Sequence, residues 1–184
     1  QSYGFLFIVA IVLCIFYWKR LDKDPKTKQQ KDGFLLSMPL LGTLILYREC
    51  AIFSRTLGAL LGAGIPLIRA LRVSREVISN SVLTGKLLQV EEDVRGGAGL
   101  GISLEKTNQF PTLLHQLVAV GEESGRTSDI LLKSAVTFDT YVRNQMSALV
   151  SALQPALIIF LAIAVGGITI TMLSAVFSMN AVEF

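Results

Sequence analysis

The sequence is poor in the residues that carry most enzyme and metal chemistry. It has one histidine, His115, and two cysteines, Cys14 and Cys50, among 184 residues. Without a Cys/His cluster there is no donor set typical of zinc, and a disulfide is not expected in this arrangement. His115 has apolar neighbours and is interpreted as structural. No serine stands in a nucleophile elbow, and no base is paired with a nucleophile. We therefore predict no catalytic residue, metal or cofactor.

Charge is missing from two long stretches, and strand-like alternation is absent. The chain is 52% hydrophobic with a mean hydropathy of +0.56, too apolar for an ordinary soluble domain. Residues 155–179 are uncharged and long enough to cross a bilayer, whereas residues 3–18 need tilt or flanking residues to do so. The first stretch lacks the basic start and cleavage site of a signal peptide. The sequence predicts two transmembrane helices, and their lack of ionisable residues argues against a channel or transporter.

Basic residues indicate how the chain is oriented in the membrane. All 17 Lys and Arg lie within residues 19–143, and six of them crowd residues 19–31 directly after the first apolar stretch. The positive-inside rule then predicts that residues 19–154 are cytoplasmic and that both chain ends are periplasmic. We interpret the basic run as a topology signal and a contact with membrane lipids, rather than as a nucleic-acid site. The chain begins with Gln1 rather than Met, as a segment of a longer protein would.

Between the apolar stretches the pattern is helical throughout. Residues 19–46 are expected to form a basic juxtamembrane linker, with a helix ending near Pro25, and an interfacial segment; residues 47–154 form a helical domain. Helices are expected over 47–61, from Pro66 to Ile78, over 82–95 after a cap at Asn80 or Ser81, behind a cap at Ser103, from Pro111, and from 127–129 into the membrane. The last helix is expected to loosen at Pro155.

Three charged or glycine-rich segments have competing interpretations. Glu49 is expected to stay in water, while the acids at 91–93 fit either a solvated helix face or an acidic contact patch. Residues 96–101 are rich in glycine, but they follow a helix and lack the residues of a phosphate-binding loop, so a flexible linker is predicted.

A tight corner at residues 121–125 is the most distinctive stretch. Gly121 and Gly125 bracket Glu122, Glu123 and Ser124 between two helical patterns. Adjacent carboxylates on a helix point in different directions, so they do not form an acid/base pair. Simple solvation and contact with a partner both remain open for this corner.

Two segments carry a resemblance to a known family. Residues 53–71, including Arg55, Gly64 and Pro66, are similar to the first signature of the type II secretion system F family. Phe110-Pro111 followed by residues 121–125 is similar to the second. The resemblance covers about residue 39 to the end of the chain.

This resemblance implies an all-α fold: an antiparallel six-helix cytoplasmic bundle flanked by two transmembrane helices. Members are non-enzymatic inner-membrane platform proteins of bacterial type II secretion and type IV pilus machines, and the chain would be the second cytoplasmic domain with its flanking spans. Implied partners are a cytoplasmic assembly ATPase, pilin-like (pseudopilin) subunits, other platform proteins and further copies of the chain. Glu122 and Glu123, with Gly121 and Gly125, are the candidate contacts. A two-span scaffold or signalling protein is the alternative from another class.

Overall fold

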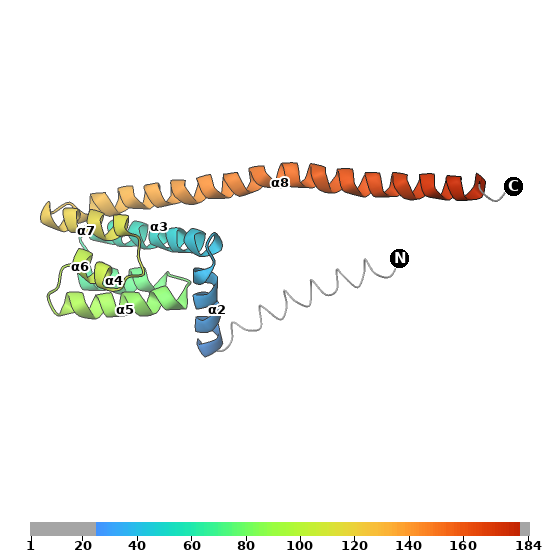
Figure 1. The fold of residues 1–184 in the computed structure, drawn as a ribbon. Helices are drawn as coiled ribbons and strands as arrows, with labels where there is room; N and C mark the ends of the chain where they lie inside the picture. Colours follow the sequence, from blue (N-terminus) through green and yellow to red (C-terminus); the bar gives the residue numbers. More distant parts are fainter. Residues whose placement is uncertain (1–24, 181–184) are drawn as a thin grey trace. The chain divides into compact units, whose positions relative to one another are not determined.

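The computed structural model describes residues 25–180, and every regular element within them is a helix (Figure 1). The expected transmembrane helix at residues 3–18 and the first basic residues after it lie outside this range. Seven helices are described: α2 (Pro25–Ser37), α3 (Leu41–Gly62), α4 (Leu67–Glu76), α5 (Ser81–Arg95), α6 (Leu100–Lys106), α7 (Thr112–Glu123) and α8 (Thr127–Asn180).

The described residues up to Val142 form one compact unit, and those from Arg143 form a second. In the first unit each helix from α2 to α6 packs on the next helix along the chain, and α2 also packs on α5. Asp32 of α2 fixes the second contact because its Oδ2 accepts from the backbone N–H (2.8 Å) and hydroxyl (2.7 Å) of Ser81. The helices therefore enclose a single core.

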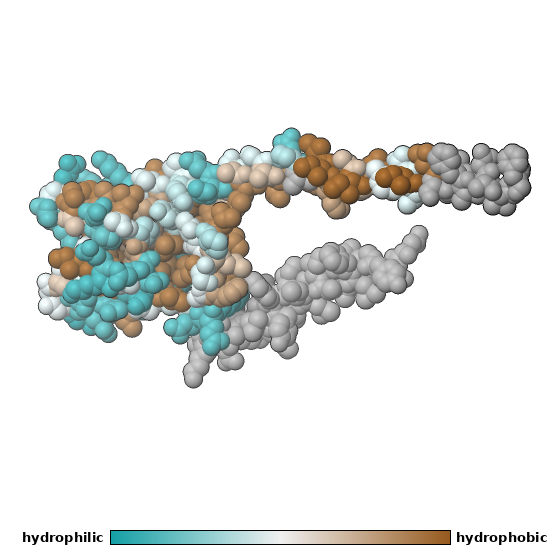
Figure 2. All heavy atoms as spheres, viewed as in Figure 1, coloured by the Kyte–Doolittle hydropathy of each residue, from teal (hydrophilic) through white to brown (hydrophobic). Residues whose placement is uncertain are grey.

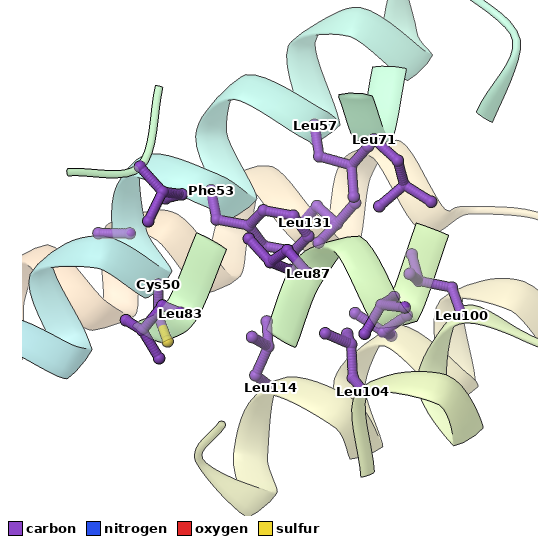
Figure 3. Packing of buried hydrophobic residues seen from close by; sticks show 14 of the residues in the cluster. Cys50, Phe53, Leu57, Leu71, Leu83, Leu87, Leu100, Leu104, Leu114 and Leu131 are labelled. Carbon is purple, nitrogen blue, oxygen red and sulfur yellow. The ribbon is translucent and has the colours of Figure 1, made fainter. Parts of the chain in front are cut away.

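That core is built from leucines and phenylalanines contributed by α3 to α8 (Figure 3). Leu57 and Leu71 reach it from the first half of the domain, while Leu104, Leu114 and Leu131 reach it from the second, and all five are at most 1% exposed. The side chains recur at three- and four-residue intervals, so each helix places one apolar stripe inward.

The N-terminal part of the domain corrects two expectations. Pro25 begins helix α2 where a linker was predicted, because a proline fits the first turn, whose N–H has no helical partner. Helix α3 begins at Leu41 rather than at Tyr47. The break around Pro39 separates the two helices, which are bent by 109°, and the predicted interfacial segment is divided between them. The described residues thus form seven helices, whereas a six-helix bundle flanked by two transmembrane helices was expected.

Two glutamates predicted to face water are buried. Glu49 is 2% exposed; its carboxylate accepts from the Ser79 N–H at 3.0 Å and lies 3.6 Å from Arg48. Glu91 is 3% exposed and pairs with three arginines, so neither a solvated face nor an acidic patch describes it. In both cases the partners come from another helix or loop as well as the same helix, which periodicity does not reveal.

One predicted helix cap is confirmed and another is wrong. Asn80, one of the two predicted caps, caps α5 by accepting from the N–H groups of Val82 and Leu83. The short helix α6, in contrast, begins at Leu100 rather than after Ser103, whose hydroxyl donates to the Gly99 carbonyl from inside the helix. The predicted linker at residues 96–101 therefore ends at Gly99.

Helix α8 is assigned without interruption from Thr127 to Asn180 and includes Pro155. Its first part supplies Leu131, Ala135 and Phe138 to the core of the first unit. Within the second unit its large apolar side chains between residues 146 and 173 are exposed, and Figure 2 shows them as a brown stretch along this helix. By length and composition α8 contains a segment able to cross a membrane.

Candidate functional site

The corner between α7 and α8 is a compact helix stop. Helix α7 ends at Glu123, and Gly125 adopts φ = +68°. The Arg126 N–H donates to the Gly121 carbonyl at 2.9 Å, and the Gly125 N–H donates to the backbone carbonyl of Glu122 at 3.3 Å. This pair of bonds is a Schellman motif, in which a left-handed residue, usually glycine, satisfies the last carbonyls of a helix. The corner is rigidly defined by its own backbone.

Gly121 allows close packing between helices and does not lie in the exposed turn itself. It lies in the last turn of α7 and is buried. A Cβ atom there would lie 2.9 Å from the Cα of Thr127, closer than a real Cβ approaches another atom. The end of α7 and the beginning of α8 can meet this closely only if residue 121 has no side chain.

Glu122 binds the beginning of another helix. Its Oε1 accepts from the Leu100 N–H at 2.6 Å and its Oε2 from the Gly101 N–H at 2.8 Å. These donors belong to the first turn of α6, whose N-cap Gly99 has no side chain to cap with. A carboxylate satisfies such unpaired N–H groups and complements the positive end of the helix dipole. Glu122 thus fixes α6 to α7 from the corner.

Glu123 differs from its neighbour because it is exposed. Ser124, Gly125 and Arg126 are exposed beside it, and Arg126 pairs with the exposed Asp129 at 3.3 Å. The two adjacent glutamates therefore have separate surroundings. Glu122 faces into the domain, whereas Glu123 presents its charge at the apex of the corner.

The first signature segment meets this corner in space. Ser128, at the start of α8, donates its hydroxyl to the Gly58 carbonyl of α3 at 2.8 Å. A pocket of roughly 300 Å³ opens at this meeting point, and both signature segments line it together with α6. Its lining residues are Leu61, Leu67, Leu100, Glu122, Gly125, Thr127 and Ser128. The lining leucines and Ser128 were not predicted as site residues: Leu61 and Leu67 were interpreted as core, Leu100 as part of a linker and Ser128 as a possible cap.

The remaining signature residues frame the same region. Gly64 ends α3 with φ = +76°, and Pro66 stands at the N-cap of α4 with φ = −55°. Pro111 occupies the equivalent N-cap place before α7, so the helix opens one residue later than predicted. Next to it, the Phe110 ring stacks on Phe53 of the first signature with centroids 6.4 Å apart.

Arg55 carries a further contact between distant parts of the chain. It leaves α3 and pairs with Asp139 of α8 near the surface. Because both side chains keep partial contact with water, the pair positions the helices more than it stabilises them.

No arrangement in the described residues suggests bond-making chemistry. Residues 25–180 contain no group of three or more metal-ligand side chains. His115 is half-buried on α7. Burial raises the pKa of the Cys50 thiol far above its usual range, and the neighbouring Glu49 raises the pKa further. A thiol held neutral is a poor nucleophile. The corner is a backbone-bonded turn with one exposed carboxylate, that of Glu123, at its apex.

Comparison with known proteins identifies the family of the chain. The family model described as "Type II secretion system (T2SS), protein F" matches residues 53–175, about two thirds of the chain. The chain belongs to the type II secretion system protein F family. Both signature segments and the corner lie within the matched region.

Curated relatives carry two kinds of name. Type II secretion system protein F of Pseudomonas aeruginosa is 31% identical over 98% of this chain, and the protein of that name from Xanthomonas campestris is 36% identical over 82%. The type IV pilus assembly protein PilC of Pseudomonas aeruginosa is 29% identical over 98% of the chain. The chain covers 44%, 37% and 48% of these relatives, respectively, and so spans less than half of each.

Proposed function

We propose that the chain is part of a non-enzymatic inner-membrane platform subunit of a type II secretion system. In this role it couples a cytoplasmic assembly ATPase to the extraction of pseudopilins and their addition to a growing pseudopilus. The family match and the names of its relatives support a platform role in a secretion or pilus machine. A helical domain joined to an apolar helix, with a rigid exposed corner, supports a mechanical role.

The convergence of both signature segments on the corner carries this proposal. Gly121 and Glu122 are engaged inside the domain and Gly125 forms the exposed turn, so together they give the corner its shape. Glu123 is the charge that a partner meets. Helix α8 begins at this corner and extends to the apolar segment. A partner that binds the corner therefore acts on the same helix that enters the membrane.

The proposed topology follows from charge and hydropathy. Residues 19–154 face the cytoplasm and both chain ends face the periplasm, because all 17 Lys and Arg lie within residues 19–143. Further partners in this proposal are other inner-membrane platform proteins, membrane lipids and other copies of the chain, with no nucleic acid.

A type IV pilus assembly platform is the second candidate. Relatives of both names occur in one organism, and they match this chain at 31% and 29% identity over the same share of its length. Identity therefore does not separate the two machines. The family match argues against the two-span scaffold or signalling protein that the sequence left open.

The test is charge reversal at Glu123 alone in the chromosomal copy of the gene. Glu123→Lys should reduce secretion into the medium, or surface pili, while the amount of membrane-inserted protein stays unchanged. Co-purification of the assembly ATPase should fall in parallel. Glu105→Lys is the matched control, because Glu105 is exposed on α6 and the charge change is the same.

Two results would contradict the proposal. Normal secretion and piliation with Glu123→Lys would remove the corner from the partner interface. An equal defect with Glu105→Lys would show that net charge, and not the corner, is responsible. Loss of only one process, secretion or piliation, identifies the machine.

A further inference from the structure

A second charged site shares no residue with the corner and lies where α4 and α5 gather three arginines around Glu91. The Glu91 Oε1 is 2.8 Å from Nη2 of Arg95 and 3.4 Å from Nε of Arg72, and its Oε2 is 3.3 Å from Nε of Arg75. The glutamate side chain is 4% exposed, so its charge is fully enclosed by the cluster.

The cluster carries more positive charge than the glutamate neutralises. Three guanidinium groups and one carboxylate leave a net charge of +2. Each guanidinium has about five N–H donors, whereas a carboxylate offers about four acceptor positions. Arg72 and Arg95 are each 55% exposed and turn unused donors towards the surface. Arg69, one turn earlier on α4, is also exposed and forms no ion pair with any described residue.

The buried carboxylate also fixes the arginines in place. The Glu91 Oε2 and the Arg75 Nε–H are buried and lack a hydrogen bond of good geometry to any described atom, so their contact is purely an ion pair. Separating Glu91 from its arginines would leave a buried charge without a partner, which is costly. This cost keeps the four side chains together. Side chains that are already ordered lose less conformational freedom when a ligand binds. Arg72 and Arg95 are therefore pre-arranged forks at the surface.

We propose that Arg72 and Arg95 bind a carboxylate-rich segment of a partner protein. Paired guanidinium forks match the planar geometry of carboxylates and accept them in a bidentate manner. A lipid surface is recognised by basic residues spread over an area, whereas Arg72 and Arg95 are held at one point by Glu91. The inference does not depend on Glu123, because the cluster and the corner share no residue.

The test measures binding of a fluorescein-labelled decaglutamate peptide to the full chain in nanodiscs of neutral lipid. R72Q/R95Q should weaken binding by about tenfold, the combined effect of two partly exposed charge pairs. The control K106Q/K133Q removes two exposed charges elsewhere and should change the Kd less than threefold, roughly the general charge effect. R72K/R95K keeps the charge but loses the forks, and should give an intermediate Kd.

The lysine variant also protects the test against misfolding, because it keeps a cation beside Glu91. Unchanged far-UV circular dichroism and thermal unfolding establish that each variant is folded. Equal Kd values for wild type and R72Q/R95Q, or an equal loss in the control, would overturn the proposal. So would wild-type binding by R72K/R95K, since charge alone would then suffice. Displacement of the peptide by phosphatidylglycerol vesicles, but not by phosphatidylcholine vesicles, would assign the site to a lipid surface instead.

Discussion

Replacing Glu122 with glutamine tests whether this residue holds the corner together. The substitution keeps the shape of the side chain but removes the charge of the carboxylate. In the wild type the two carboxylate oxygens accept from the N–H groups of Leu100, at 2.6 Å, and Gly101, at 2.8 Å. Glutamine has one carbonyl oxygen, so it can accept from one of these donors. Its amide group then faces the other donor, and a buried N–H is left without a partner.

The expected loss follows from these two bonds. A hydrogen bond to a charged group contributes about 1.5–3 kcal/mol, and an orphaned buried donor costs about 1–3 kcal/mol. Because one bond survives in neutral form, we expect a local destabilisation of about 2 kcal/mol, which corresponds to about a 30-fold larger opening equilibrium.

Hydrogen exchange followed by mass spectrometry can measure this opening in the full chain in detergent. Peptides that cover α6 should exchange about 30-fold faster in Glu122→Gln, in line with the estimated free energy. In Glu123→Gln they should stay within about threefold of wild type, because exposed charges contribute little. Unchanged exchange in Glu122→Gln, or equal acceleration in both variants, would refute the capping role of Glu122.

Three further outcomes are expected. Gly121→Ala should lower the stability of the domain by about 1–3 kcal/mol through overpacking. Gly85→Ala, where a Cβ meets nothing within 4 Å, should instead raise the stability by about 0.5–1 kcal/mol. Denaturant titration in detergent measures both variants, and similar effects of the two would contradict the close packing at Gly121. In a Cys14→Ser background, Cys50 should resist maleimide at pH 8 until the domain is unfolded, since burial holds its thiol neutral; rapid labelling of folded protein would disprove this. Arg55→Gln should reduce stability by less than about 1 kcal/mol in the same titration, and a larger loss would show that the pair is a main support.

Much of the fold could be predicted from residues that act on their own surroundings. The apolar stripes predicted helices, and Asn80 predicted its cap, because these signals operate within one or two turns. Two predictions were wrong for a related reason: Pro25 was expected near a helix end and Ser103 at a cap, but each is compatible with more than one position in a helix, and the choice depends on what packs against it. The start of α3 at Leu41 rather than Tyr47 was missed as well.

The candidate site was predicted in part. The signature segments and the bend at residues 121–125 were identified from sequence, and the structure brings them together around one pocket. The different surroundings of Glu122 and Glu123 could not be predicted, because two adjacent glutamates look alike until α6 is placed against one of them. The burial of Glu49 and Glu91 was missed because their partners come from other parts of the fold.

By itself, then, the sequence determined the helical class, the apolar segment of α8 and the position of the corner. Each of these depends on periodicity, on a long uncharged run or on the backbone freedom of glycine, all of which are local properties. The tertiary structure alone decided which glutamate caps α6, which one is enclosed by arginines and which one is exposed. Those outcomes depend on atoms 19 to 22 residues apart in the chain, such as Arg72 with Glu91 and Leu100 with Glu122, which meet only when the core has formed.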